Sequence, residues 1–463
     1  MAYPVILFDS ANGNDTNASG AGPTIAITST SGSTDAAGTV VTIPNANLSG
    51  VAVDGSHAVY ISGQGLRSIT AVADSGLSTA NVTVSTAFTG SLTSQTVAIG
   101  GVRQYLFGST RSEIESSCEA GWTLSLAAGH TENLTAPTSL NFGDTRTNPI
   151  TIKGDASDRA HFISLHTSFA SSFDFSGSLG LRLENIDFEH YRGSSVGAEG
   201  EAYYIVYVGS GAYVKNCSVT AAKMYQSMSL FYHHYGVSVT YVNCEAKYIE
   251  SSNFKYVTGV GFGGRTYIAI GCTVKNLLCG FSTQTYSGYQ QTIAFCQADV
   301  KYGISATNSY DYGLTCVGNV FNLQDTGYFL ALAANWLYST SGSYQVFNNV
   351  VTSSGSYTSV SLSSTPYPER FVRLVIMNNC FHNGTMDSDI DAFVQVNNIS
   401  TDPQLSGDAG SFALGSQEVI DHVGVSAGLG MGNTSEEAGT QIYPFRQWAQ
   451  QDPELIVHPL RSN

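Results

Sequence analysis

The sequence has few charged residues and no surplus of basic ones. Only 12% of its 463 residues are charged, and 19 Lys and Arg stand against 35 Asp and Glu, which gives a formal net charge of −16. Proteins that bind nucleic acids use Lys and Arg to neutralise phosphates. The composition therefore argues against a nucleic acid as a partner.

Long apolar runs and a leader-like start are also missing. No stretch of about 18 consecutive apolar residues occurs, so we expect no transmembrane helix and no membrane as a partner. Met1-Ala2-Tyr3-Pro4 begins without a basic region followed by an apolar one. We therefore expect no signal peptide.

The eight cysteines contain no C-x-x-C pair. Without paired ligands of that kind we expect no zinc site, and we expect no other metal and no cofactor. Five of the cysteines recur at one place in a repeat, so stacking of reduced thiols explains them more simply than disulfide bridges do. That indicates folding in a reducing cytoplasm.

A short phrase recurs between about residues 181 and 381, as in Lys215-Asn216-Cys217-Ser218-Val219 and Val242-Asn243-Cys244-Glu245-Ala246. The residue after the Asn serves as a marker, and successive markers lie 24 to 31 residues apart. The markers are Ile186, Cys217, Cys244, Cys272, Cys296, Val320, Val350 and Cys380. Such a period is typical of a stacked repeat.

Each phrase alternates between apolar and polar residues, as a strand with one buried face does. Five markers and the residues two positions after each would point inward; these markers are Ile186, Cys217, Cys244, Cys272 and Cys296. The sequence therefore predicts an all-β protein built around a right-handed parallel β-helix. In six of the eight turns we expect an Asn at one corner of the coil, because Asn tolerates left-handed backbone geometry. These are the Asn residues at 185, 216, 243, 319, 349 and 379.

Three regions follow from this reading. Residues 1–108 lack the repeat and predict a small β-domain, with strands at 24–28, 39–43, 58–61, 68–72, 81–84 and 96–99. Residues 109–434 form the β-helix. Ser112 and Glu115 have the spacing of a capping box, which predicts a short helix near 111–118 covering the first coil. Residues 435–463 predict an extension that packs on the β-helix or on a neighbouring subunit.

Two resemblances rest on these residues. Residues 120–424 resemble the pectate-lyase-like β-helix superfamily, through the Asn-Cys and Asn-Ile phrases and an ending around Phe412-Ala413-Leu414, although Gln417 stands where a Pro is usual. The N-terminal region resembles a small domain of tailed-bacteriophage virion proteins, through Phe8-Asp9-Ser10, Ala18-Ser19-Gly20-Ala21-Gly22-Pro23, Val53-Asp54-Gly55-Ser56-His57 and Thr96 to Arg103. Together they imply a virion surface protein that is a homotrimer, assembled in the host cytoplasm and attached to the particle through residues 1–108.

Carboxylates on outward strand faces are the candidate catalytic groups, because β-helix enzymes cut polysaccharides with such residues. The principal candidates are Asp187, Glu189, Glu245 and Asp299, and further ones are Glu250, Asp311 and Asp325. Lys247 and Lys275 occupy the same repeat offset as Glu189 and Asp299, so a solvated face of mixed charge is the simpler interpretation. His233 and His234 are adjacent on a strand and would point to opposite faces, so they would not chelate one metal together.

Tyrosine is abundant, with 26 residues. Coil packing, a trimer interface and sugar stacking all suit it. Two hypotheses of function remain. The first is a non-enzymatic decoration or cement protein on the capsid exterior, with the major capsid protein or other virion proteins as partners. The second is a tailspike or tail fibre that binds or depolymerises a host-surface polysaccharide as a hydrolase or lyase.

Overall fold

The computed structural model describes most of the chain outside the C-terminal region. The described residues are 5–15, 27–53, 57–61, 63–165, 171–191, 203–222, 228–233, 238–249, 259–285, 290–308, 313–334, 343–361, 373–386 and 394–423. The chain divides into a first unit, Met1–Leu165 with Phe173–Phe188, and a second unit, His166–Ser172 with Glu189–Asn463. The predicted extension 435–463 lies outside the described residues. No helix of the described part is long and apolar enough to cross a membrane.

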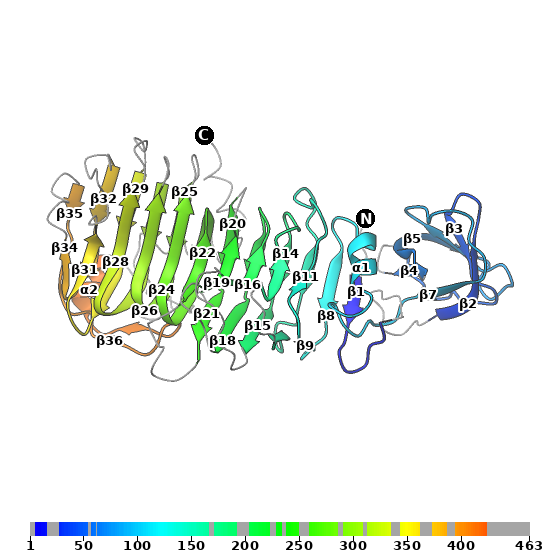
Figure 1. Cartoon of the computed structure of the whole chain (residues 1–463), viewed down its shortest axis with the longest axis horizontal. Coiled ribbons are helices and arrows are strands. Elements are labelled where there is room, and N and C mark those ends of the chain that lie inside the picture. Colours follow the sequence, from blue (N-terminus) through cyan, green and yellow to red (C-terminus); the bar gives the residue numbers. More distant parts are fainter. Residues whose placement is uncertain are drawn as a thin grey trace. The chain divides into compact units, whose positions relative to one another are not determined.

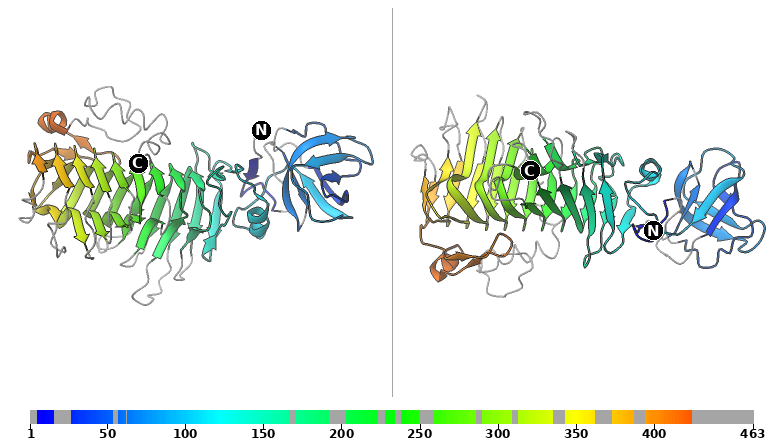
Figure 2. Two further views of the ribbon diagram at one scale, coloured as in Figure 1. Left: turned by 90° about the horizontal axis from the view of Figure 1, so that it is seen from above. Right: turned by 60° about the horizontal axis from the view of Figure 1, so that its bottom comes forward.

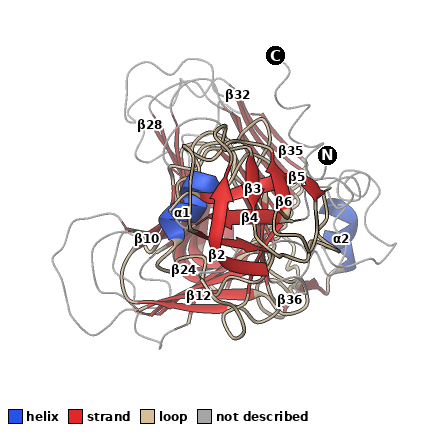
Figure 3. Ribbon diagram, turned by 90° about the vertical axis from the view of Figure 1, so that its right-hand side faces the viewer, coloured by secondary structure: helices blue, strands red, loops and turns tan. Residues whose placement is uncertain are grey.

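The first unit contains a closed antiparallel barrel in the strand order β2-β3-β6-β5-β4-β7 (Figures 1 and 3). Its strands are β2 (Ile27–Thr34), β3 (Val40–Thr42), β4 (Ala58–Ile61), β5 (Gly65–Ala73), β6 (Asn81–Val84) and β7 (Gln95–Ile99). Val41, Val59, Val82 and Val97 lie in its core with no exposed surface. The alternation of apolar and polar residues predicted these strands, and the small N-terminal β-region is confirmed.

The chain enters the β-helix before it enters the barrel. The strand β1 (Val5–Phe8) pairs in parallel with β8 (Thr123–Leu126), with Val5 opposite Thr123. Residues 5–8 therefore belong to the coils, and the barrel is inserted between β1 and the rest of the first unit. The further coil strands here are β9 (Thr131–Leu134), β10 (Thr138–Ser139), β11 (Thr151–Lys153), β12 (Ala160–Ser164), β13 (Phe173–Phe175), β14 (Arg182–Glu184) and β15 (Ile186–Tyr191).

The helix α1 (Arg111–Ser117) forms where the sequence predicts one, but the capping box is wrong. The N-cap residue is Thr110, and no side chain caps the helix there. The Glu115 carboxylate instead accepts a hydrogen bond from the backbone amide of Asn141 at 2.9 Å, because α1 turns Glu115 toward the first coils. On its other side α1 packs against β5 of the barrel.

The second unit is a stack of coils whose strands pair in parallel with the coil before and after (Figures 1 and 2). One sheet holds β17 (Tyr213–Lys215), β20 (Val239–Val242), β23 (Tyr267–Ile270), β25 (Gln290–Ala294), β27 (Gly313–Val317), β29 (Ser343–Phe347), β32 (Arg373–Met377) and β35 (Val394–Val396). The other holds β16 (Tyr203–Val208), β18 (Ser218–Ala222), β19 (Met228–His233), β21 (Glu245–Tyr248), β22 (Val260–Gly264), β24 (Thr273–Thr285), β26 (Gln297–Asn308), β28 (Val320–Ala334), β30 (Val350–Ser353), β31 (Tyr357–Ser361), β33 (Cys380–Phe381) and β34 (Gly384–Met386). The predicted parallel β-helix is confirmed.

The inward row after the corner begins with cysteines and continues with asparagines. Cys217, Cys244, Cys272 and Cys296 are buried, and the following coils put Asn319, Asn349 and Asn379 in line with them, all fully buried. Each Asn amide donates to the next Asn carbonyl, at 2.8 Å from Asn319 to Asn349 and 2.9 Å from Asn349 to Asn379. These bonds satisfy polar groups that would otherwise be buried without partners.

The prediction that Asn319, Asn349 and Asn379 occupy the corner is therefore wrong by one residue. The left-handed corner positions are Asn185, Asn216, Asn243, Gly271, Phe295, Gly318, Asn348, Asn378 and Asn397, with φ between 52° and 65°. The predicted corner Asn is correct in the early coils. In the later coils the corner is the residue before the predicted Asn, namely Gly318, Asn348 or Asn378. Asn-Asn doublets at 348–349 and 378–379 made both assignments compatible with the sequence.

The same shift moves the last three markers off the inward row. Val320, Val350 and Cys380 pair with one another along the row of Gln297, which faces away from the coil interior. They are nevertheless fully buried, because β36 (Leu405–Ser406), β37 (Ala413–Leu414) and α2 (Gln417–Val423) pack over them (Figure 2). Gln297 Oε1 accepts hydrogen bonds from the Gly410 and Phe412 amides at 2.7 and 3.1 Å.

Candidate functional site

Glu245 lies on an outward face of the second unit, where the alternation placed it. Its carboxylate is 2.9 Å from Lys275 Nζ and 3.8 Å from Lys247 Nζ, and the three side chains are each about one-third exposed. Lys247 and Lys275 are register partners on neighbouring coils. Such half-exposed pairs contribute little stability, about 1 kcal/mol or less. The two lysines of the adjacent outward column therefore neutralise Glu245.

Asp187 and Glu189 lie on β15 and engage different neighbours. Asp187 Oδ1 is 3.1 Å from Arg159 Nη1, which comes from the preceding coil. The Glu189 carboxylate accepts a hydrogen bond from the Tyr191 hydroxyl at 2.7 Å. This hydrogen bond to a carboxylate raises the pKa of Tyr191 to about 12. Each carboxylate is therefore used in a local contact.

Asp299 shares the column of Lys275 on the neighbouring coil. Its carboxylate accepts hydrogen bonds from Asn322 Nδ2 at 3.1 Å and Gln324 Nε2 at 3.4 Å. The structure thus brings Glu245 together with two lysines and Asp299 together with two amides. Glu250, Asp311 and the side chain of Asp325 lie outside the described residues.

His233 is fully buried, and its Nε2 accepts a hydrogen bond from the Thr266 amide at 3.1 Å. This contact holds the ring between adjacent coils, while His234 lies outside the described residues. Within the described ranges, no group of three or more His, Cys, Asp or Glu side chains is arranged to hold a metal ion.

Two tyrosine clusters lie on described strands of the second unit. The rings of Tyr204 and Tyr232 are stacked with centroids 3.6 Å apart, and Tyr207 lies 5.2 and 5.6 Å from them. Burial raises the pKa of Tyr232. In the other cluster, Tyr302 and Tyr328 are stacked at 4.4 Å, and the Lys301 ammonium is 5.3 Å from the Tyr302 centroid. Tyr204, Tyr207, Tyr302 and Tyr328 remain partly exposed.

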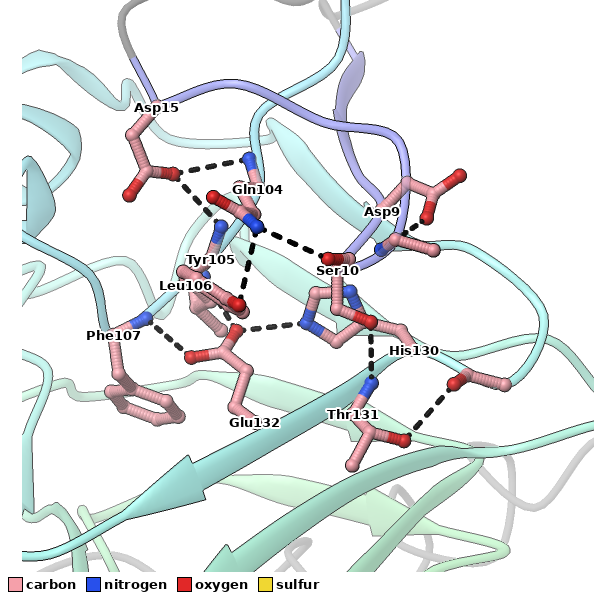
Figure 4. Close-up of polar contacts among 12 residues, drawn as sticks. Asp9, Ser10, Asp15, Gln104, Tyr105, Leu106, Phe107, His130, Thr131 and Glu132 are labelled. Atoms are coloured by element: carbon pink, nitrogen blue, oxygen red, sulfur yellow. Dashed lines mark hydrogen bonds and ion pairs between the residues drawn. The ribbon is translucent and has the colours of Figure 1, made fainter.

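The first unit contains a buried polar network that the sequence did not predict (Figure 4). The Glu132 carboxylate is 2% exposed and accepts hydrogen bonds from the amides of Leu106 at 2.6 Å and Phe107 at 2.9 Å. His130 Nε2, also buried, lies 2.8 Å from the same carboxylate. The network fastens the segment after the barrel to the first coil. Because a Glu on an alternating strand usually faces solvent, the pattern itself carried no signal for it.

A second set of contacts fixes the same segment from the barrel side. Arg103 is fully buried, with its guanidinium 4.9 Å above the Tyr60 ring and its Nη1 donating to Thr110 Oγ1 at 2.8 Å. The Tyr60 hydroxyl in turn donates to the Glu113 carboxylate of α1. Asp15 Oδ1 accepts from the amides of the two residues that follow Arg103, at 3.0 and 2.9 Å. Barrel, α1 and first coil are thereby joined by buried polar groups.

Comparison with known proteins identifies no family for this chain. No family model and no curated protein matches the chain. Among solved structures, the catalytic domain of a GH87 alpha-1,3-glucanase in complex with tetrasaccharides is similar at 9% sequence identity, covering 79% of this chain and 91% of that one. Its TM-score is 0.27, so the likeness carries no argument about this chain.

Proposed function

We propose that this protein is a non-enzymatic structural component of a virion surface, a decoration or cement protein on the capsid exterior that acts as a homotrimer. Its partners are further copies of itself and the major capsid protein or other virion proteins. The barrel is the attachment domain.

The observation that carries the proposal is the use of the outward carboxylates. Glu245 is held between Lys247 and Lys275, and Asp187 is held by Arg159. A general acid or a nucleophile needs a carboxylate whose environment sets its pKa for catalysis. Carboxylates that form ion pairs with basic side chains on the same outward face have a structural role instead.

The buried network of the first unit supports an attachment role for the barrel. Glu132 holds the segment after the barrel, and Arg103 holds α1 and the barrel strands together. The hydrogen bonds of these buried groups join the segment after the barrel to the first coil and to α1.

Location on the particle tests the proposal. Gold-labelled antibodies against the barrel, or a reconstruction of the particle, should place the protein on the head. Density around the tail would refute a decoration role. Light scattering of the purified chain tests the trimer, and a monomer at micromolar concentration would refute that part.

A tailspike that binds or cuts a host-surface polysaccharide is the second candidate. The stacked Tyr204 and Tyr232 with Tyr207, and the pair Tyr302 and Tyr328 beside Lys301, favour it. Partly exposed aromatic rings suit stacking on sugars. Release of reducing ends from host capsule would support this candidate, and it would refute the non-enzymatic role.

A further inference from the structure

Two neighbouring strands of the second unit, β26 and β28, present polar side chains on one outward face. Asp299 and Asn322 are register partners on these strands, and both are partly exposed. The Asp299 carboxylate accepts hydrogen bonds through Oδ1 from Asn322 Nδ2 at 3.1 Å and from Gln324 Nε2 at 3.4 Å. Because each bond fixes the plane of an amide group, the three side chains present hydrogen-bonding groups in defined directions.

An aromatic pair with a cation continues the same face. Along β26, Lys301 and Tyr302 follow Asp299 after one fully buried residue, Val300. The rings of Tyr302 and Tyr328 are stacked with centroids 4.4 Å apart, and both side chains are partly exposed. The Lys301 ammonium lies 5.3 Å from the Tyr302 centroid. We call this set the β26–β28 face; it consists of Asp299, Lys301, Tyr302, Asn322, Gln324 and Tyr328.

Lys301 has a different electrostatic setting from the neighbouring outward lysines. Lys247 and Lys275 lie 3.8 and 2.9 Å from carboxylate oxygens of Glu245. Among the residues that the structure describes, no carboxylate forms an ion pair with Lys301. The chain as a whole carries a formal net charge of −16, so a partly exposed cation without an acidic partner favours an anionic ligand at this place.

The other tyrosine cluster lies in line with the β26–β28 face. One register column joins the two clusters, and its members are Tyr204, Ser229, Val260, Cys279, Tyr302 and Tyr328. Tyr232, whose ring stacks on Tyr204, lies on β19, three coils before Tyr302. Neighbouring coils are about 4.8 Å apart, so Tyr232 and Tyr302 are about 14 Å apart along the stack. Two aromatic clusters aligned in this way suit an elongated ligand that runs along the coils.

We propose that the β26–β28 face binds an acidic oligosaccharide. The sugar rings stack on Tyr302 and Tyr328, because aromatic rings offer apolar surface to the C–H faces of sugars. The sugar hydroxyls bond to Asp299, Asn322 and Gln324, and a sugar carboxylate pairs with Lys301. The proposal rests on the second candidate function, the binding of a host-surface polysaccharide, and it requires no cleavage.

Calorimetric titration of the full chain with defined hexasaccharides tests the proposal. The acidic probes are fragments of hyaluronan, alginate and polygalacturonate, and the neutral probes are maltohexaose and chitohexaose. We expect at least one acidic probe to bind, and to bind more weakly as salt is added, because ions screen the attraction to Lys301. The neutral probes should bind more weakly than that acidic probe by roughly tenfold or more.

Variants of the β26–β28 face separate its parts. Tyr302→Ala removes the aromatic surface and should weaken binding of the acidic probe by roughly tenfold. Tyr302→Phe keeps the ring and should bind as the unaltered protein does, which distinguishes loss of the ring from loss of the fold. Lys301→Gln should weaken binding by roughly fivefold at low salt and less at high salt. Lys215→Gln is the matched control, because Lys215 is a partly exposed lysine on the other sheet, and it should leave the affinity unchanged.

Three results would overturn the proposal. No binding of any acidic probe, or equal binding of acidic and neutral probes, would each contradict the assigned ligand class. Unchanged affinity in both Tyr302→Ala and Lys301→Gln would mean that the sugar binds elsewhere; the second candidate function would then stand without this site. The decoration role is judged separately, because the position of the protein on the particle does not depend on any of these titrations.

Discussion

Asn349 lies at the centre of the asparagine row, and its replacement tests the register of the coils. Its side-chain amide donates to the carbonyls of Cys316 at 3.1 Å and Phe347 at 3.0 Å and to Asn379 Oδ1 at 2.9 Å. Its Oδ1 accepts the backbone and side-chain amides of Asn319 at 3.1 and 2.8 Å. Asn349 is fully buried, so water cannot replace these partners.

Asn349→Gly should therefore be costly. The substitution leaves the buried Asn319 backbone amide without its acceptor, which costs about 1–3 kcal/mol, and removes about two further hydrogen bonds worth about 1 kcal/mol each. We expect the free energy of unfolding to fall by about 3–5 kcal/mol, measured by urea denaturation followed by far-UV circular dichroism.

Asn348→Gly is the matched control at the adjacent position. Asn348 is at the corner with φ of 56°, a conformation that glycine adopts without strain. Only its partly exposed bond to the Val423 carbonyl is lost, so the expected cost is about 1 kcal/mol or less. Equal costs at the two positions, or a larger cost at 348, would refute the register described above.

Three other perturbations have defined outcomes. Glu132→Gln keeps one hydrogen-bond acceptor but turns an NH₂ group toward a backbone N–H. Hydrogen exchange of the backbone amides of residues 104–108, measured by mass spectrometry, should therefore accelerate. Unchanged exchange would contradict the role of this buried carboxylate. Gln297→Ala removes the oxygen that accepts the backbone amides of Gly410 and Phe412. Hydrogen exchange of the amides at residues 405–416 should therefore accelerate, while amide exchange in the barrel stays constant. Burial raises the pKa of the Cys244 thiol well above its usual range, so the native protein should resist iodoacetamide at pH 8 and react on unfolding; rapid native labelling would argue against the buried row.

Local patterning predicted the barrel strands and the coils because both depend on nearest-neighbour chemistry. The run Asn81–Val84 alternates and is bounded by turn formers, and it forms β6 at those residues. Glu245 and Asp299 face outward as their alternation predicted. What the sequence could not supply is the partner of each, because Lys275 approaches Glu245 only after the next coil has stacked in register.

The register of the later coils was predicted wrongly for a physical reason. Val320, Val350 and Cys380 are apolar and stand at the same marker position as the inward cysteines, but they do not lie in the coil interior. Their burial instead comes from Phe412 and α2, which follow in the sequence after the last coil. Once these elements pack over the row, its outward side chains are as inaccessible to water as inward ones. Polarity alone then no longer reports which face a residue occupies.

The sequence by itself determined an all-β chain with a small N-terminal β-region, a coil period and a run of stacked cysteines, because periodicity and turn chemistry act over a few residues. Tertiary structure decided that β1 joins the coils before the barrel begins and that Glu132 is buried. It also decided that asparagines continue the cysteine row and that residues 405–423 cover the outward row of Val320, Val350 and Cys380. Each of these depends on contacts between residues far apart in the chain, whose pairing only the folded coils establish.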